Sequence, residues 1–183
     1  MKNYELRMEK IVIVDFNPEW ADIYEKEREG LSNILEGIDI RIEHIGSTSV
    51  NGLGAKPIID VLLGLEDFEK DKDELIKRMT DSGYNYIDKF EHVMPYRRYF
   101  NKTSEGVVTS YHIHSVQIGE WFWNRHIAFR DYLRAHDDVR DEYCRVKKEL
   151  AKKIWEHGGD YAWAKTDFIV PVQEKAMKEY GMM

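Results

Sequence analysis

The chain has 183 residues, of which 43% are hydrophobic and 13% aromatic, and its formal net charge is −7. This length and composition suit one packed globular domain over residues 1–183 and exclude a disordered or fibrous protein. The acidic balance argues against general binding to nucleic acid, because that affinity depends mainly on cations that neutralise phosphates. The chain's one cysteine, Cys144, excludes an intramolecular disulfide and a cysteine-based zinc cluster.

The sequence favours a cytoplasmic location. Residues 1–16 carry scattered charges and lack the long apolar segment and small-residue cleavage site of a signal peptide. Elsewhere, no apolar run approaches the roughly 18 to 20 residues that are needed to cross a bilayer. We therefore expect a soluble cytoplasmic protein that does not engage a membrane.

A strand and a helix are predicted near the start of the chain. Residues 10–16 are rich in β-branched side chains, and they precede Asn17 as an N-cap and Pro18 at the first helical position. Apolar residues then recur at helical spacing as far as Leu35. Gly37 follows, where a helix usually stops.

Two further predicted strands enclose a loop. Residues 38–45 alternate in polarity, which places His44 on one face and Glu43 on the other. Residues 57–65 are more continuously apolar, a pattern typical of a strand that is covered on both sides. Asp60 stands in the middle of this strand among apolar neighbours, where an unpaired charge would be costly.

The remaining chain divides into a strand-rich part and a helical part. The patterns predict a helix over 72–83 and strands over 84–87, 97–102 and 107–118. Helical periodicity begins near residue 120, and one expected apolar stripe consists of Tyr143, Val146, Leu150 and Ile154. Pro171 should interrupt or kink the last helix. We expect an α+β core with a mixed sheet over about 8–119 and a helical unit over about 120–183.

The loop after the second strand carries Gly46, Ser47, Thr48 and Ser49, and Lys56 lies at its far end. Glycine lets the backbone approach a ligand closely, and hydroxyls with free N–H groups can hold phosphate oxygens. The loop is neither a P-loop nor a dinucleotide-binding fingerprint, because its glycine and lysine spacing differs from both. A phosphate cradle and a tight structural turn both remain open.

Asp60 requires a partner, which could be loop amides, Lys56 or a divalent cation such as Mg²⁺. His112 and His114 share one face of a later strand and could ligate a metal, contact a ligand or pack structurally. As metal ligands they would favour zinc or manganese over magnesium. His44, beside the loop, could act as a catalytic acid or base near neutral pH or be structural.

Arg130 and Arg134 are one helical turn apart, so both could reach the same phosphate or carboxylate. Asp131 could orient one of them. A lattice of surface ion pairs, which usually contributes little to stability, is the alternative interpretation.

Four segments together resemble the GrpB-like family, which is assigned to the nucleotidyltransferase superfamily with a polymerase-β-like core. They read "IEHIGSTSVNGLGAKPIIDVLLGL" from residue 42, "YHIHSV", "FRDYLR" and "YAWAKTDFI". The resemblance implies that Gly46 and Ser47 hold nucleotide phosphate and that Asp60 is the first of two metal-binding acids. Leu62 occupies the position of the second acid. By the same resemblance, Lys165 is a triphosphate contact.

The resemblance implies a nucleotidyltransferase that moves a nucleotidyl group from a nucleoside triphosphate to an unknown small acceptor, with Mg²⁺ or Mn²⁺ at Asp60. Because a two-metal mechanism needs several ligands, Leu62 favours an alternative without catalysis. That alternative is a degenerate module that binds a nucleotide or metabolite. It could be linked to coenzyme A, because GrpB-like domains also occur joined to dephospho-coenzyme A kinase. Whether the chain is an enzyme stays open at this point.

Overall fold

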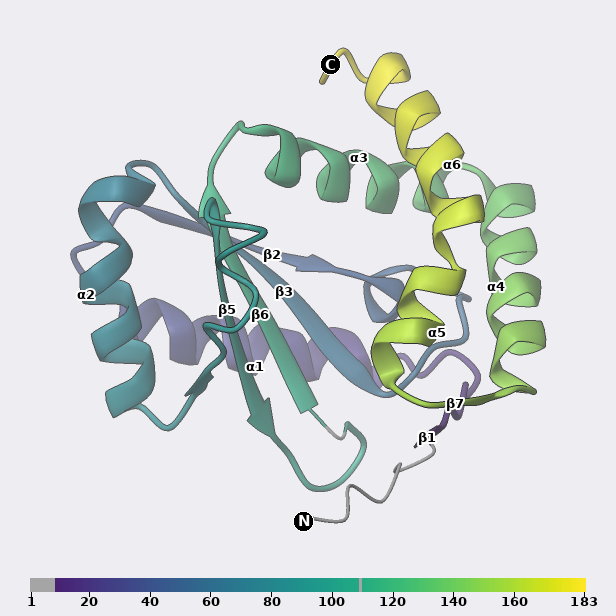
Figure 1. Ribbon diagram of the computed structural model, residues 1–183, viewed down its shortest axis with the longest axis horizontal. Coiled ribbons are helices and arrows are strands. Elements are labelled where there is room, and N and C mark those ends of the chain that lie inside the picture. The colour runs from purple at the N-terminus through teal and green to yellow at the C-terminus, as the bar shows by residue number, and fades with distance from the viewer. Residues whose placement is uncertain (1–8, 109) are drawn as a thin grey trace.

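The computed structural model describes residues 9–108 and 110–183, and its centre is a mixed β-sheet (Figure 1). Among the described residues, five strands form this sheet in the order β2-β3-β6-β5-β4. Only β3 and β6 pair in parallel within it. The strands are β2 (Ile40–Ile45), β3 (Ile58–Leu65), β4 (Asn85–Tyr86), β5 (Arg97–Thr103) and β6 (Ser110–Gln117). The predicted α+β fold with a mixed sheet is confirmed.

Helices cover the sheet in two groups. The first group, α1 (Glu19–Ile34) and α2 (Phe68–Asp81), shares one hydrophobic cluster with β3. The second group follows the sheet in the chain and gathers beside α3 (Figure 1): α3 (Trp121–Ala135), α4 (Asp137–Ala151), α5 (Gly158–Ala164) and α6 (Thr166–Glu179). We call residues 120–183 the helical unit. In the described ranges, no helix combines the length and the apolar character that crossing a bilayer requires.

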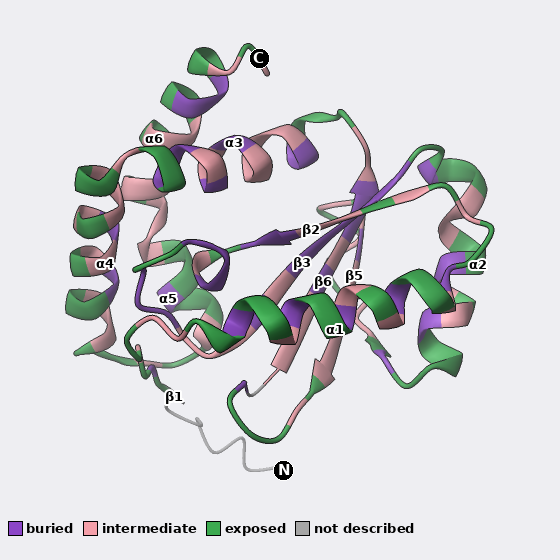
Figure 2. Ribbon diagram, turned by 180° about the vertical axis from the view of Figure 1, so that it is seen from behind, coloured by how far each residue is buried: buried purple, intermediate pink, exposed green. Residues whose placement is uncertain are grey.

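Most of β3 is buried (Figure 2), and strand alternation divides its side chains between these two groups of helices. Ile59, Val61 and Leu63 are fully buried on the side of α1 and α2. Leu62 is equally buried on the opposite side, where it packs against Phe122 and Trp123 of α3. Asp60 is two residues from Leu62, so it faces the helical unit and not α1.

The predicted strand over residues 10–16 is wrong in extent. The structure has a short β1 (Glu9–Lys10), which pairs with β7 (Ile154–Trp155), and beyond it an isolated bridge joins Val14 to Ala55. In the described part of this segment, strand pairing is limited to these places, so a β-branched composition alone does not make a longer strand. The capping hydrogen bond predicted for Asn17 is present, because its Oδ1 accepts from the Glu19 N–H at 2.9 Å, but Glu19 and not Pro18 is the first residue of α1.

Three other expectations need adjustment. Helix α2 begins at Phe68, earlier than predicted, because the Asp67 side chain caps it by accepting from the Lys70 N–H. Ile154 does not belong to the apolar stripe of α4; it lies in β7 and is 65% exposed. Helix α6 continues through Pro171, so of the two outcomes expected there only a kink is compatible with the structure.

Candidate functional site

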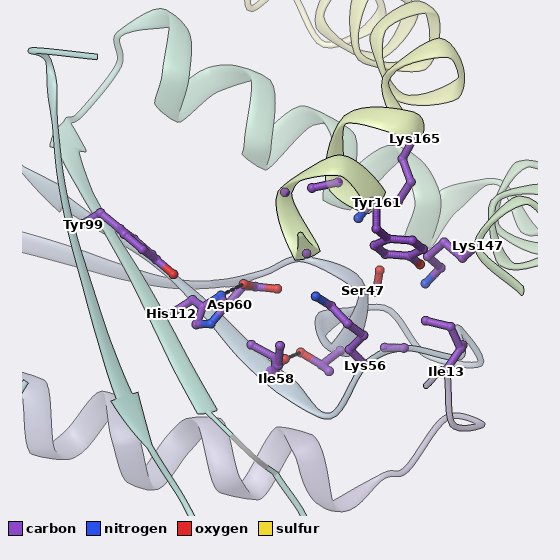
Figure 3. A pocket seen from close by; sticks show the side chains of 15 residues that line it. Ile13, Ser47, Lys56, Ile58, Asp60, Tyr99, His112, Lys147, Tyr161 and Lys165 are labelled. Atoms are coloured by element: carbon purple, nitrogen blue, oxygen red, sulfur yellow. Dashed lines mark hydrogen bonds and ion pairs between the residues drawn. The ribbon is translucent and has the colours of Figure 1, made fainter. Parts of the chain in front are cut away.

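A cavity of about 550 Å³ lies between the sheet and the helical unit (Figure 3). The turn after β2 and strands β3, β6 and β5 line one side of it, and α4 and α5 line the other. The polar and aromatic lining residues are Ser47, Thr48, Lys56, Asp60, Tyr99, His112, Lys147, Tyr161 and Lys165. The structure therefore brings together the predicted turn, Asp60, His112, Lys56 and Lys165.

The turn that begins at Gly46 lies directly against Asp60. Gly46 has φ 70° and ψ −174°, a backbone conformation that is essentially restricted to glycine. A Cβ added there would lie 2.9 Å from Cγ of Asp60 and still closer to its Oδ2. Ser47–Ser49 then form a 3-10 turn, in which the Ser49 hydroxyl donates to the Gly46 carbonyl at 2.6 Å. Glycine is needed here because the carboxylate occupies the space of a side chain.

Asp60 is held as a carboxylate beside an imidazole. Its Oδ1 lies 3.6 Å from Nδ1 of His112, and both side chains are partly exposed to the cavity. Burial alone would raise the pKa of Asp60, but the adjacent His112 ring and the Lys165 ammonium lower it below its usual value. The Tyr99 hydroxyl points toward this pair (Figure 3), and burial and the Asp60 charge raise the pKa of Tyr99 to about 12.

Three lysines face the same cavity (Figure 3). Lys56 and Lys165 lie near the Tyr161 ring, with their Nζ atoms 5.6 Å and 4.9 Å from its centroid. Lys147 is only 2% exposed, and its ammonium donates a hydrogen bond to the Gly54 carbonyl. Burial and the charge of Lys165 lower the pKa of Lys147 to about 7. The cavity thus combines three amines with one carboxylate.

Sequence reasoning missed Lys147, Tyr161 and Tyr99 as lining residues. One signal was available for Lys147, because it follows Tyr143 by four residues and so shares its buried helical stripe. A lysine on an apolar stripe indicates either a buried amine or a stem that reaches solvent. The sequence does not distinguish these two, since the choice depends on what packs over the helix.

His114 shares a face with His112 but is engaged elsewhere. Its Nδ1 lies 3.2 Å from Nη1 of Arg97, and its ring stacks on Tyr99 with centroids 5.0 Å apart. Burial lowers the pKa of His114 to about 3, so the ring is neutral at physiological pH. His112 is the histidine that meets Asp60, as their pairing in the β3 to β6 register requires.

The donor set does not fit a two-metal centre. In the described part of the chain, no group of three or more His, Cys, Asp or Glu side chains is arranged to hold a metal ion. Asp60 and His112 supply two donors, whereas His114 is occupied by Arg97. The second acidic position, Leu62, is buried under α3. These residues could at most complete the coordination of a Mg²⁺ that arrives on ligand phosphates, which is a common arrangement for this ion.

His44 lies on the opposite face of β2 from the cavity. It pairs with Val61 in the sheet register, and its ring stacks on Tyr24 of α1 with centroids 4.5 Å apart. Its Nε2 is 3.0 Å from Oγ1 of Thr48, and burial lowers its pKa to about 4. An acid or base role at the Asp60 cavity is therefore not supported, because strand alternation turns the imidazole away.

Arg130 and Arg134 bind the protein's own groups. Nη1 of Arg130 contacts the Glu43 carboxylate at 2.6 Å and the His44 carbonyl at 3.1 Å, and its Nε pairs with Asp131 at 2.7 Å. Arg134 donates twice to the Ser49 carbonyl, at 3.1 Å and 2.8 Å. Neither lines the main cavity, although Arg130 borders a smaller hollow beside Asp60. In the structure Arg130 supports the end of β2 and Arg134 supports the turn, and a phosphate contact by this pair stays a prediction.

Sequence comparison finds relatives along nearly the whole chain. The model of the family described as "GrpB protein" matches residues 10–175. The UPF0157 protein YqkA of Bacillus subtilis is 35% identical over 169 residues, which cover 92% of this chain and 48% of YqkA. A dephospho-CoA kinase of Mycobacterium leprae is 26% identical over 164 residues, covering 75% of this chain and 39% of that kinase. The chain thus spans about half the length of YqkA and less of the kinase.

Comparison with solved structures also finds a GrpB protein. The crystal structure of GrpB from Enterococcus faecalis has a TM-score of 0.79 and 35% identity, covering 92% of this chain and 99% of that one. The Cid1 poly(U) polymerase bound to MgGTP has a TM-score of 0.53 and 12% identity, covering 76% of this chain and 44% of that one. The second likeness concerns the fold alone. From the family match and these two structures, the chain belongs to the GrpB family and has a nucleotidyltransferase-like α+β fold.

Proposed function

We propose that the Asp60 cavity binds a nucleotide or a related phosphorylated metabolite. The observation that carries this proposal is the convergence of three lysines and the Gly46 turn on one cavity that holds a single carboxylate. Phosphate groups carry negative charge that ammonium groups attract, and charge-assisted hydrogen bonds to phosphate are stronger than neutral ones. Burial lowers the pKa of Lys165 because it makes the charged form of the side chain less stable. A phosphate anion in the cavity would stabilise that ammonium group.

Binding without catalysis is favoured by the arrangement around Asp60. Leu62 is fully buried against α3, so no acid stands beside Asp60 on β3. His112 lies 3.6 Å from the carboxylate and carries an imidazole, so it does not replace a second acid. Ligands worth testing include the four ribonucleoside triphosphates, because structures of Cid1, which this fold resembles, hold MgGTP or MgATP. Dephospho-coenzyme A is a further choice, because a dephospho-CoA kinase is among the relatives.

Isothermal titration calorimetry with ATP, GTP, CTP, UTP and dephospho-coenzyme A tests this proposal. We expect saturable binding of at least one of them and a loss of about 10-fold or more in affinity for Lys165→Met, which removes a charge-assisted bond. Lys77→Met is the matched control, because Lys77 lies on α2 with its side chain 69% exposed and outside the cavity. Absence of binding for all five compounds, or equal affinities for both variants, would contradict the proposal.

A second candidate is metal-dependent transfer of a nucleotidyl group from a nucleoside triphosphate to a small acceptor, with pyrophosphate as the leaving group. The contact between Asp60 and the Gly46 turn favours it, since this places one carboxylate where a triphosphate held by the turn would lie. Mg²⁺ or Mn²⁺ would enter with the triphosphate. The acceptor would occupy the part of the cavity beside Tyr99 and His112.

Mass spectrometry separates the two candidates. The protein is incubated with the four ribonucleoside triphosphates, Mg²⁺ or Mn²⁺ and a metabolite extract, and Asp60→Asn serves as the control. Transfer predicts a nucleotidyl mass gain on one metabolite with the wild-type protein alone. Binding without transfer predicts no such product even where calorimetry detects the nucleotide. Turnover that survives Asp60→Asn would exclude a metal-dependent role for this carboxylate.

A further inference from the structure

We propose that His44 and Arg134 are positioning residues that fix the shape of the Gly46–Ser49 turn from outside the cavity. The effect of these residues on ligand affinity rests on the proposed function, in which the turn receives the ligand, whereas their effect on the shape of the turn does not. Neither side chain lines the main cavity, whereas Ser47 and Thr48 do. Both side chains instead contact the turn from behind, on the side of a separate small hollow of about 240 Å³.

The hydrogen bonds define which nitrogen of His44 carries the proton. The Thr48 hydroxyl donates to the Ile58 carbonyl at 3.0 Å, and a hydroxyl has one proton to donate. His44 Nε2, 3.0 Å from the same Oγ1, must therefore be the donor. Neutral His44 then has its proton on Nε2 and none on Nδ1. A lowered pKa of about 4, caused by burial, agrees with a neutral ring.

This chain of bonds joins both ends of the loop. It begins at His44 on β2, passes through Thr48 in the turn and ends at Ile58, the first residue of β3 and two positions before Asp60. The His44 ring is fixed in turn, because it lies nearly parallel to the Tyr24 ring at an interplanar angle of 10°. The Tyr24 hydroxyl donates to the Ile42 carbonyl at 2.9 Å, which secures that ring against β2.

Arg134 holds the other end of the turn. Its Nε and Nη2 both donate to the Ser49 carbonyl, at 3.1 Å and 2.8 Å, and its Nη1 lies 3.4 Å from Asp131. The carbonyl of Ser49 is thus fixed by α3 while Thr48 is fixed by β2 and β3. The Ser49 N–H and hydroxyl both bond to the Gly46 carbonyl, so the restraint extends to the glycine that touches Asp60.

Nuclear magnetic resonance tests this inference without any ligand. Long-range nitrogen-15 spectra should show His44 as the Nε2–H tautomer, whereas an Nδ1–H tautomer would overturn the proposal. Amide hydrogen exchange at Ser49 and Val50 reports the turn, because their N–H groups bond to the Gly46 and Ser47 carbonyls. We expect exchange about 5-fold to 10-fold faster in His44→Phe, which keeps the ring stack but loses the donor.

His44→Gln is the conservative control, because its amide keeps an N–H donor near the same position. We expect its Ser49 and Val50 exchange to stay within about 2-fold of the wild-type rate. Amide exchange in α2 serves as the reference for global stability, because α2 lies away from the turn. After correction for any change in global stability, α2 exchange should be the same in both variants. Equal exchange at Ser49 for the Phe and Gln variants would overturn the role of the donor.

For Arg134→Met, we expect the same selective acceleration of exchange at Ser49 and Val50, and unchanged exchange at these two amides would overturn the role of Arg134.

ATP affinity supplies the functional readout. His44→Phe and Arg134→Met should each weaken ATP binding by about 5-fold to 10-fold, while His44→Gln binds like the wild type. In the exchange measurement, adding Thr48→Val to His44→Phe should cause little further acceleration at Ser49, because both changes break one chain of bonds. If wild-type protein binds none of the tested nucleotides, the proposed function fails, and the exchange data alone decide the positioning role.

Discussion

At the scale of single residues, Gly46 and Asp60 form the contact on which the site depends. The carboxylate lies where a side chain of residue 46 would be, and the glycine backbone has a conformation that other residues rarely adopt. Asp60 also remains ionised because His112 and Lys165 offset the cost of its burial. One position thus combines a steric requirement and an electrostatic one.

Gly46→Ala should destabilise the protein by about 2 kcal/mol or more, because it combines backbone strain with a clash against Asp60. Gly30→Ala is the matched control: this glycine lies within α1, and nothing approaches within 4 Å of its added Cβ. The control should be neutral or stabilising by about 0.5 to 1 kcal/mol. Urea unfolding measures both, and equal midpoints for the two variants would show that the turn tolerates a side chain.

Three histidines predict a loss of stability in acid. Burial lowers the pKa of His114 to about 3 and those of His44 and His126 to about 4, below the ordinary value of about 6.5. Between these pKa values, the unfolded chain binds more protons than the folded chain does. The free energy of unfolding therefore falls as pH drops from about 7 toward 4.

Each histidine should contribute roughly 1 to 2 kcal/mol to this loss by pH 5. Urea titrations at pH 7.5 and pH 5 measure it, and His126→Gln should reduce the difference between the two pH values. The lowered pKa of Asp60 acts in the same direction at more acid pH. Its ionised carboxylate stabilises the folded protein, and this contribution is lost as the pH falls through the pKa that Asp60 has in the folded state. A pH dependence that is unchanged in His126→Gln would mean that this ring is protonated in the folded protein.

At the scale of elements, α3 connects the helical unit to the turn. Arg130 contacts Glu43 and the His44 carbonyl, and Arg134 contacts the Ser49 carbonyl one helical turn later. The spacing of this pair is the one that the sequence indicates, but their partners are backbone carbonyls and carboxylates of the protein. Through these contacts, helix α3 holds the end of β2 and the turn that follows it.

Arg130→Met should lower the free energy of unfolding by about 1 to 3 kcal/mol, because a buried carbonyl and a partly buried Glu43 lose their donor. Arg145→Met is the control, since Arg145 forms an exposed pair with Glu142 that should contribute less than about 1 kcal/mol. Adding Glu43→Gln to Arg130→Met should recover part of the loss. Thermal and urea unfolding measure these differences, and equal effects at the two arginines would contradict the structural role of Arg130.

At the scale of the whole molecule, the cavity exists only where the sheet and the helical unit meet. Asp60, His112 and Tyr99 come from strands, whereas Lys147 and Lys165 come from the last third of the chain. The same junction covers Leu62 with Phe122 and Trp123, so forming the cavity and burying this face of the sheet are one event. The two parts of the chain should therefore fold together.

A chain that ends at residue 119 should fail to fold cooperatively. Its sheet would expose Ile45, Leu62 and Val116, which the full chain buries under α3. Within the full chain, Trp123→Ala should cost about 3 to 5 kcal/mol, because it leaves a cavity against the same face. Circular dichroism during heating measures both, and a cooperative transition in the shortened chain would show that the core is independent of the helical unit.

The sequence by itself determined the local patterns of this protein. Alternation in β2 and β3 separated His44 from Glu43 and set Asp60 on the face of Leu62, because side-chain direction in a strand depends only on position. Cap and stop residues placed α1 closely, through the hydrogen bond from Glu19 to Asn17. The glycine and hydroxyl loop beside Asp60 was also recognisable, since these residue types are required wherever a backbone comes close to another group.

Only the tertiary structure decided which groups meet across the chain. It placed Lys147, which sequence reasoning missed, beside Lys165 in the cavity, and it placed the His114 ring against Arg97. It also turned His44 and Arg134 into supports of the turn, because their partners lie 4 and 85 positions away in the sequence. Burial and hydrogen-bond partners depend on how distant segments pack, and residue spacing along one strand or helix does not specify that.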